Sequence, residues 1–292
     1  MAGTGGTADV CGRYVMARAT SDLVALGDAE TNEELVLRQS WNVAPTAEVP
    51  ILVAHADDGG AGGTRGGDGG AGVTRRIHVA RWGLVPPWAK ELSVGSRAFN
   101  ARSETVACKP TFRAAVRARR CAVPVEGYYE WKTPEPGAKG PDGRAAKKQP
   151  YYVHPAGAGD GEGPVIWFAG LYEWWQDPEA KAAGEDAWVL STTILTMAGP
   201  DADDDDPVLA ALGQLHDRLP VPMDAETMDR WLAPDTLGSA EEADALVGEV
   251  CAGAYDVAAG WSLRPVGGAV GNVRNNGPEL TQEMREQQGT LL

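Results

Sequence analysis

The 292-residue chain is 43% hydrophobic and holds ten tryptophans, so it can bury a sizeable core in one large domain or two small ones. Its apolar runs are shorter than the roughly 18 residues that a membrane-spanning helix needs, and its first ten residues lack the basic start and apolar stretch of a signal peptide. The net charge of −15 argues at face value against a nucleic-acid partner. We therefore expect a soluble, cytoplasmic protein without a membrane partner, associated with the nucleoid if the source is bacterial.

The N-terminal half combines strand-like runs with a glycine-rich stretch. A helical pattern begins at Asp22 and ends near Gly27, and runs rich in Val and Ile predict strands over 49–55 and 77–85. The intervening stretch 57–74 holds nine glycines and is expected to be flexible. A helix over 109–119 and a strand over 120–131 follow.

The C-terminal half repeats this alternation of strands and loops. Strands are predicted over 151–156, 165–175 and 188–196. Surface loops are predicted over 133–148, 176–187 and the acidic run 201–207. Helices are expected over 225–232 and 239–252, the second with Ser239 as its N-cap.

This order of elements predicts an α+β fold. We expect a single domain over 11–280, built on a mostly antiparallel, barrel-like β-sheet core with peripheral helices. Residues 1–10 form an extension before it, and residues 281–292 are expected to be a disordered tail. The domain is expected to be a monomer.

The charge is unevenly distributed along the chain. Between Arg81 and Cys121, nine basic residues and two acidic ones give a net charge of +7. Tryptophans and Phe99 are interleaved with them, and a basic groove with aromatic side chains is what single-stranded nucleic acid needs. Candidate contacts in and around this segment are Arg81, Trp82, Pro86, Trp88 and Arg102. The alternative is that these aromatic residues belong to the core.

The cysteines and histidines give no sign of a metal site. Cys11, Cys108, Cys121 and Cys251 are widely spaced without a CxxC pair, and no two histidines have the spacing of metal ligands. We expect no metal, no cofactor and no disulfide framework. The last three cysteines are expected to be buried, reduced thiols.

Polar residues inside apolar runs are the candidates for chemistry, because burying them is costly unless they are paired or used. Glu130 lies between Tyr129 and Trp131, where desolvation would raise its pKa and suit it to general acid or base catalysis. Asn100 and Arg102 stand in a similar context. The alternative is a structural ion pair between Glu130 and a buried arginine such as Arg102.

Two further segments carry candidate polar groups. His216 is followed by Asp217 and Arg218, a setting that suits a proton relay, although a histidine in a surface turn is the alternative. Arg274 and Asn275 lie in an amide-rich Asn-Gly turn whose side chains suit phosphate or base contacts.

Cys11 has a role that depends on the ten residues before it. A cysteine at a free N-terminus carries an α-amine and a thiol, which together can close a thiazolidine ring on an aldehyde. An internal cysteine has only the thiol, because its nitrogen is an amide.

Taken together, these segments resemble the SOS-response-associated peptidase (SRAP) family of abasic-site processing proteins. The matching segments follow in family order: CGRY (11–14), WNVAPT (41–46), RWGLVPPWAK (81–90), FNARSET (99–105), KPTFRAAVRARRCAVPVEGYYEWK (109–132), QPYYV (149–153), FAGLYEW (168–174), STTILT (191–196), LHDRLPV (215–221), WL (231–232) and VGNVRNNGPEL (270–280). They cover nearly all of residues 11–280.

The resemblance implies a protein that crosslinks to abasic sites in single-stranded DNA through a thiazolidine formed by Cys11. It implies that Glu130 is the acid/base glutamate, also used to remove the residue before the cysteine. His216 would assist protonation at the sugar, and Asn100 would hold the reacting group. Arg13 and Arg102 match basic residues near the DNA backbone, and lyase activity is a further implication.

The chain departs from the family pattern at its start, because ten residues precede Cys11 where the family has only a methionine. Val10 could be encoded by a GTG start codon, the extension could be removed by autoproteolysis, or it could stay and block the reaction. Two other functions are open: a thiol peptidase that uses Cys11 and His216, and a non-covalent binder of single-stranded DNA.

Overall fold

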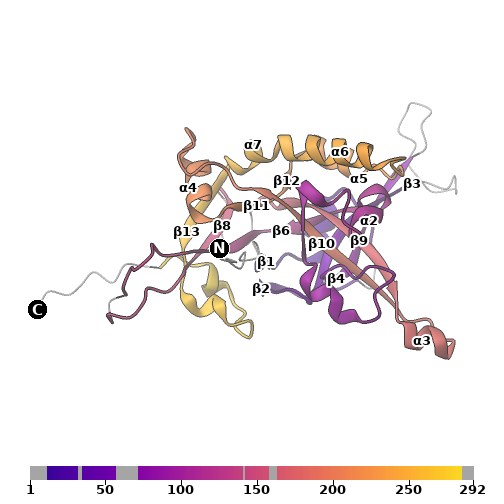
Figure 1. Cartoon of the computed structure of the whole chain (residues 1–292), viewed down its shortest axis with the longest axis horizontal. Coiled ribbons are helices and arrows are strands. Elements are labelled where there is room, and N and C mark those ends of the chain that lie inside the picture. The colour runs from indigo at the N-terminus through magenta and orange to yellow at the C-terminus, as the bar shows by residue number, and fades with distance from the viewer. Residues whose placement is uncertain (1–11, 32–34, 57–71, 141, 158–162, 285–292) are drawn as a thin grey trace, which may run out of the picture.

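The computed structural model describes residues 12–31, 35–56, 72–140, 142–157 and 163–284, which form two β-sheets with helices around them (Figure 1). Cys11, the extension before it and most of the predicted glycine-rich loop lie outside the described residues. Within the described part, no helix has the length and apolar character needed to cross a membrane.

Five strands close into a barrel. In order around the ring they are β10 (Trp188–Ala198), β4 (Val73–Trp82), β3 (Glu48–Ala56), β6 (Arg120–Val125) and β9 (Ile166–Gln176), and β9 pairs with β10 again. Each pairing is antiparallel except that of β10 with β4, which is parallel. Closing the sheet removes the exposed edges that an open sheet would present. The predicted barrel-like, mostly antiparallel core is confirmed.

Three short strands extend the barrel strands beyond the ring. β5 (Asn100–Arg102) runs parallel to β10, with Asn100 opposite Ile194. β11 (Arg218–Pro220) pairs with the other edge of β10, and β12 (Pro222–Met223) pairs with β9. The segments that carry Asn100 and His216 are therefore both attached to β10.

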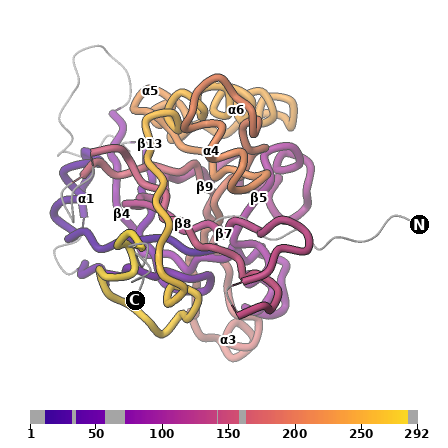
Figure 2. Tube along the Cα trace, turned by 90° about the vertical axis from the view of Figure 1, so that its left-hand side faces the viewer, coloured from indigo at the N-terminus to yellow at the C-terminus, as the bar shows by residue number. Residues whose placement is uncertain are grey.

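A second sheet of five strands lies beside the barrel, in the order β13 (Trp261–Pro265), β8 (Gln149–Pro155), β7 (Gly127–Lys132), β1 (Tyr14–Met16) and β2 (Ser40–Val43). Successive side chains of a strand point to opposite faces. The inner face, with Tyr128 and Val153, joins the main core cluster, whereas the outer face carries Tyr129 and Tyr152. Figure 2 shows β13, β8 and β7 side by side, with the yellow C-terminal segment next to them. That segment contains the 3-10 helices η3 (Gly268–Gly271) and η4 (Pro278–Thr281).

Helices pack on the outside of the sheets, and α5, α6 and α7 lie along one side in Figure 1. The predicted helices over 225–232 and 239–252 are confirmed as α5 and α6, and the Ser239 hydroxyl accepts the Glu242 amide at 3.2 Å as the N-cap. Bounds of the helices are α1 (Thr20–Leu26), α2 (Arg113–Ala118), α3 (Pro178–Ala183), α4 (Pro207–Leu215), α5 (Ala225–Leu232), α6 (Ala240–Ala252), α7 (Ala254–Ala258), η1 (Leu92–Arg97) and η2 (Ser103–Thr105).

The predicted strand over 120–131 is two strands in two different sheets. The break falls at Glu126, between β6 in the barrel and β7 in the second sheet. Its carboxylate accepts the Ala17 amide at 3.0 Å and the Arg18 guanidinium at 2.7 Å. These bonds hold the chain at the point where it leaves the barrel and pairs with β1.

Two helices begin within or at the end of predicted loops, and both start with the same N-cap pattern. Asp177 and Asp206 are N-caps, each followed by a proline at the first helical position, and they start α3 and α4. Gly184 ends α3 with a φ of 78°, in the left-handed region that suits glycine. The predicted loop 133–148 does lack regular helices and strands beyond an isolated bridge, as far as its residues are described.

The C-terminal segment is ordered further than the sequence predicts. Residue 281 was expected to begin a disordered tail, but Thr281 is buried and closes η4. Glu283 pairs with Val266, and the Met284 amide donates to the Pro265 carbonyl at 2.9 Å. Residues 285–292 lie outside the described residues.

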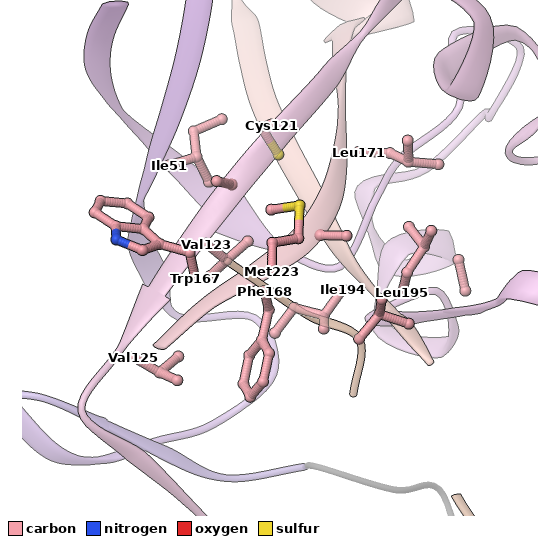
Figure 3. Packing of buried hydrophobic residues seen from close by; sticks show 14 of the residues in the cluster. Ile51, Cys121, Val123, Val125, Trp167, Phe168, Leu171, Ile194, Leu195 and Met223 are labelled. Atoms are coloured by element: carbon pink, nitrogen blue, oxygen red, sulfur yellow. The ribbon is translucent and has the colours of Figure 1, made fainter. Parts of the chain in front are cut away.

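Apolar side chains of β3, β6, β9 and β10 pack together in the core (Figure 3). Ile51, Val123, Phe168 and Ile194 are fully buried there. Trp231 of α5 is equally buried, and its indole donates to the carbonyls of Cys121 and Gly170 at 3.0 and 3.2 Å, which fastens α5 to the barrel.

The cysteines only partly match the prediction of buried thiols. Cys121 is fully buried, and desolvation raises the pKa of its thiol to about 12. Cys251 is half-buried, but Cys108 is exposed, so the prediction is wrong for Cys108. It follows the short helix η2 at the surface, a position that composition alone could not indicate.

Part of the basic segment holds the fold together. Arg120 is buried, and its guanidinium donates to five backbone carbonyls: those of Val116, Arg117, Trp231, Ala233 and Asp235. Arg119 forms an ion pair of 2.7 Å with the buried Glu173. These two charges are engaged inside the molecule, so the surface charge of the segment is smaller than the sequence suggests.

Arg120→Lys is expected to lower the free energy of unfolding by about 2–3 kcal/mol, because an ammonium cannot reproduce the planar fork and buried carbonyls lose their donors. Denaturant unfolding measures this change. The matched control is Arg113→Lys, at an exposed position of α2, which should change the free energy by less than about 0.5 kcal/mol. Equal losses for both variants would contradict this role of Arg120.

Candidate active site

The described chain begins directly beside Glu130. The Tyr129 amide donates to the Arg13 carbonyl at 2.9 Å, and Tyr14 pairs with Tyr128 in an antiparallel register. Continuing this register sets Gly12 opposite Glu130. Cys11 lies outside the described residues; the hydrogen bond at Arg13, two residues after it, is made to Tyr129, the neighbour of the predicted acid/base glutamate.

Glu130 is a buried carboxylate in the middle of the sheet. Its side chain is on the inner face with Tyr128, it is 5% exposed, and its Oε1 accepts the Trp131 amide at 2.9 Å. Arg102, the partner considered in the structural alternative, is exposed. A buried carboxylate in the middle of a sheet suits a group that exchanges protons during a reaction.

Asn100 is tied to β1 through a chain of three aromatic rings. The Trp82 indole donates to the Phe99 carbonyl at 2.9 Å, directly before Asn100, and the two rings meet edge to face at 5.7 Å. On its other side, the Trp82 ring lies against the Tyr14 ring, and the two ring centroids are 5.0 Å apart. Trp82 therefore connects the strand that carries Asn100 to the strand that follows Cys11.

This position of Trp82 corrects one prediction. Trp82 is fully buried, so its expected contact with DNA is wrong. Pro86, another predicted contact, is buried as well, whereas the neighbouring Pro87 and Trp88 are exposed. The sequence shows an aromatic residue in a basic segment but not which way its side chain points.

His216 caps the C-terminal end of α4, a helix that packs against β7 and thus against the strand of Glu130. Its Nδ1 lies 3.0 Å from the Arg218 amide nitrogen and 2.9 Å from Asp217 Oδ1. One nitrogen cannot accept from the amide and donate to the carboxylate at once. The neutral ring accepts from Arg218 and keeps its proton on Nε2, whereas the protonated ring can donate from Nδ1 to Asp217. Both protonation states have a partner, which suits proton transfer.

Arg13 is half-buried and serves the fold of the site. Its guanidinium donates to Asn42 Oδ1 at 3.2 Å and to the Val270 carbonyl at 3.0 Å, and burial lowers its pKa. Asn42 in turn donates to the carbonyls of Val270, Asn272 and Asn275 at 3.3, 3.0 and 2.9 Å. Together they fix the turn that presents Arg274, whose side chain is exposed.

Asn42 is a residue that the sequence reasoning did not single out. It lies between Trp41 and Val43 in an apolar strand and is 5% exposed. The rule that drew attention to Asn100 and Glu130, a polar residue within an apolar run, applies to it equally. Asn275, which was singled out, is half-buried and donates from Nδ2 to the Ala269 carbonyl at 2.8 Å, so it too supports the turn.

The remaining predicted DNA contacts lie at the surface. Trp88 is 62% exposed and lines a groove of about 620 Å³ with Lys90 and Arg97. Arg102 is exposed, and Arg81 is half-buried with one nitrogen donating to the Thr46 carbonyl at 2.9 Å. A second groove, of about 560 Å³, runs along β2 and is lined by Arg38 and Arg274.

No group of three or more His, Cys, Asp or Glu side chains in the described part of the chain is placed to hold a metal ion. The candidate residues are a carboxylate on β7 (Glu130), an imidazole at the end of α4 (His216) and an amide on β5 (Asn100). These groups can donate and accept protons and can position a small polar substrate.

Comparisons with known proteins agree with this geometry. A family model described as SOS response associated peptidase (SRAP) matches residues 10–273. The abasic site processing protein YoqW of Bacillus subtilis is 28% identical over 226 residues, which are 77% of this chain and 81% of that protein. The abasic site processing protein HMCES of Rattus norvegicus is 26% identical over 264 residues, 82% of this chain and 64% of that protein.

The fold is also found among solved structures. A crystal structure of a protein from Bacteroides thetaiotaomicron has a TM-score of 0.65 and 20% sequence identity, and the match covers 94% of this chain and all 100% of that one. A protein from Bordetella bronchiseptica gives a TM-score of 0.55 at 20% identity, with 88% of this chain covered. These likenesses establish the α+β architecture of the chain.

Asn42→Ala is expected to loosen the turn over residues 270–276, because three backbone carbonyls lose their buried donor at a cost of about 2–3 kcal/mol. Amide hydrogen exchange should show faster exchange in this turn, while β7 and the barrel strands stay protected. Asn272→Ala, which removes only the acceptor of the Arg274 amide, is the control and should have a smaller effect. Unchanged exchange in Asn42→Ala would contradict the role assigned to it.

Proposed function

Because the chain belongs to the SOS response associated peptidase (SRAP) family, we propose that it processes abasic sites in single-stranded DNA by forming a covalent crosslink through Cys11. The observation that carries the proposal is the register of β1 with β7, which sets the residue after Cys11 beside the buried Glu130. The two named relatives are abasic site processing proteins, which supports the substrate class.

The proposed reaction joins two nucleophiles of one residue to one aldehyde carbon. The ring-opened abasic sugar carries the aldehyde at C1′. The α-amine of Cys11 attacks this carbon, and loss of one water gives an imine. The thiol then adds to the imine carbon, and its proton passes to the nitrogen, which closes the thiazolidine. The net change is the release of one water, without an oxidant or reductant.

The three candidate groups have separate roles in this proposal. Glu130 accepts a proton from the Cys11 amine and returns one to the leaving water, so it acts as general base and then as general acid. His216 protonates the sugar oxygen during ring opening, with its second nitrogen held by the Arg218 amide or by Asp217. Asn100 holds the reacting group from the strand that Trp82 fixes.

The chemistry requires Cys11 to be the first residue of the reacting protein. The family match begins at residue 10, one position before Cys11. We propose that the residues before Cys11 are absent from the reacting form, either because translation begins at residue 10 and that one residue is then removed, or because the Val10–Cys11 bond of the longer chain is hydrolysed. Hydrolysis would consume one water and release the α-amine, and Glu130 is the proposed base for it.

The proposed path of the DNA strand uses the two grooves with exposed cationic side chains. Trp88 offers an exposed ring for stacking, with Lys90 and Arg97 beside it for the phosphates. Arg38 and Arg274 line the second groove. Each groove is lined by two cationic side chains and one carboxylate, Glu91 in the first and Glu48 in the second, in a chain whose net charge is −15.

A chain that begins at Cys11 should form an SDS-resistant adduct with single-stranded DNA that contains one abasic site. Its intact mass should equal protein plus DNA minus one water. Cys11→Ser should abolish this adduct because it cannot close the ring, and Glu130→Gln should slow its formation at least about 100-fold. Cys108→Ser, which changes an exposed thiol away from the site, should react normally.

The 292-residue chain should remain unreacted unless its mass first falls by the residues before Cys11. An equal adduct on the intact chain would contradict the proposed chemistry. Turnover of a peptide with no DNA adduct would favour a thiol peptidase, and reversible binding alone would favour a non-covalent binder.

Trp88→Ala should weaken binding of undamaged single-stranded DNA by about 5- to 100-fold, because one stacked base is lost. Fluorescence anisotropy over a range of salt concentrations measures this, and the salt dependence should not change. Arg97→Gln should instead reduce the slope of log K against log salt by about 0.7. Trp174→Ala is the control, since Trp174 is 45% exposed on β9 but lines neither groove. Equal losses for Trp88 and Trp174 would contradict the proposed path.

A further inference from the structure

A separate cavity opens on the outer face of the five-stranded sheet. It has a volume of about 370 Å³ and is lined by side chains from β1, β2, β8, β13 and η4, among them Trp41, Tyr152, His154 and Arg264. This size falls within the usual range of small-ligand pockets. None of the residues proposed above for catalysis or DNA contact lines it.

The cavity and the proposed active site are on opposite faces of the same sheet. Glu130 alternates with Tyr129 along β7, and Tyr129 belongs to the outer cluster with Tyr152. Arg264 pairs with Tyr152 in the antiparallel register, so both side chains share the outer face. The cavity also reaches Ala17 and Glu126, at the end of the β1–β7 pair away from Arg13 and Glu130.

Arg264 carries a positive charge that no carboxylate neutralises. No ion pair or side-chain hydrogen bond of Arg264 occurs within the described residues, and its Nε is buried without a partner. Its guanidinium lies 5.3 Å from the centre of the Tyr152 ring. The two acids of the cavity are Glu126, which is paired with Arg18 at 2.7 Å, and Asp22, whose carboxylate accepts the Ser21 hydroxyl. An unpaired arginine in a cavity suits a bidentate anion.

The aromatic side chains next to Arg264 are arranged as a stack. Tyr152 and His154 lie nearly parallel, with ring centres 5.1 Å apart and an angle of 20°. His154 Nδ1 is 2.9 Å from the Pro155 carbonyl, which can only accept, so Nδ1 carries the proton. In the neutral ring Nε2 is then an acceptor. Trp41 adds a further aromatic side chain to the lining.

We propose that this cavity binds one nucleotide. Its phosphate oxygens would engage the two terminal nitrogens of Arg264 side by side. The base would pack against Trp41, and an amino or hydroxyl group of the nucleotide would donate to His154 Nε2. The same chemistry is present in a free nucleotide and in one nucleotide of a DNA strand that continues past the sheet. The inference does not rest on the crosslinking chemistry, which uses the other face.

Isothermal titration of the 292-residue protein with dAMP tests the proposal, with inorganic phosphate and deoxyadenosine as probes of its two halves. dAMP is expected to bind with a Kd below about 1 mM. Phosphate and deoxyadenosine are each expected to bind at least about tenfold more weakly than dAMP. Arg264→Gln should weaken dAMP binding about tenfold or more, and Arg264→Lys should weaken it as well, because the ammonium lacks the bidentate fork. Arg113→Gln, at an exposed position of α2, is the control and should bind normally.

Trp41→Ala should weaken binding of dAMP but leave binding of phosphate unchanged. If an undamaged oligonucleotide competes with dAMP, the nucleotide in the cavity belongs to the DNA strand. If the oligonucleotide and dAMP bind independently, the ligand is a free nucleotide. Either result supports the site. Binding of dAMP no tighter than phosphate, or unchanged in both Arg264 variants, would overturn the proposal. Because Arg264 and Glu130 face opposite sides of the sheet, that failure would leave crosslinking by the Cys11 chain unaffected.

Discussion

The hydrogen bond from the Tyr129 amide to the Arg13 carbonyl is the contact on which the site depends, because it aligns the start of the described chain with Glu130. β1 is only three residues long, so its hydrogen bonds alone could not hold it. All three side chains are buried: Tyr14 at 0%, Val15 at 2% and Met16 at 3% exposure. Alternation sends Tyr14 to Trp82 on the inner side and Val15 into the outer cluster, and this packing on both faces fixes the strand.

The site gathers residues from distant parts of the chain through a few buried connections. Trp82 ties the strand of Asn100 to β1, and α4, which ends at His216, packs against β7. Arg120 and Trp231 bind α5 to the barrel that carries these elements. The barrel is closed and tightly filled, so it provides a rigid base from which short strands and turns extend (Figures 1 and 3). The polar groups of the site therefore lie on elements whose positions are set by the core.

Much of this fold could be predicted from the sequence, where the pattern was long enough. The barrel strands show runs of Val, Ile and aromatic residues, and α5 and α6 carry clear helical signals with N-caps. β1, β2 and β5 could not be found in this way, because three or four residues do not establish a period. The break at Glu126 was missed because apolar residues continue on both sides of it, and only the carboxylate's bonds to Ala17 and Arg18 mark the change of sheet.

The residue types of the candidate site could be predicted from the sequence, but which of the residues are exposed could not. Glu130 was identified because a carboxylate within an aromatic run is costly, and it is buried as expected. The composition assigned Trp82 and Arg120 to a DNA-binding segment, yet both side chains are buried. A segment that passes through the core turns some of its side chains inward and others to the surface. Arg13 was likewise matched to a DNA contact, but its guanidinium donates to Asn42 Oδ1 and to the Val270 carbonyl. Which side of a segment faces solvent is decided by tertiary packing.

The most direct test of the account locates the covalent bond. A chain that begins at Cys11 is crosslinked to abasic single-stranded DNA, digested with nuclease and trypsin, and the peptides are identified by tandem mass spectrometry. We predict that the sugar remnant is found on the peptide Cys11–Arg13, with neither the amine nor the thiol of Cys11 available to acylating or alkylating reagents. A remnant on a lysine or on the exposed Cys108, with both groups of Cys11 still reactive, would contradict the central claim.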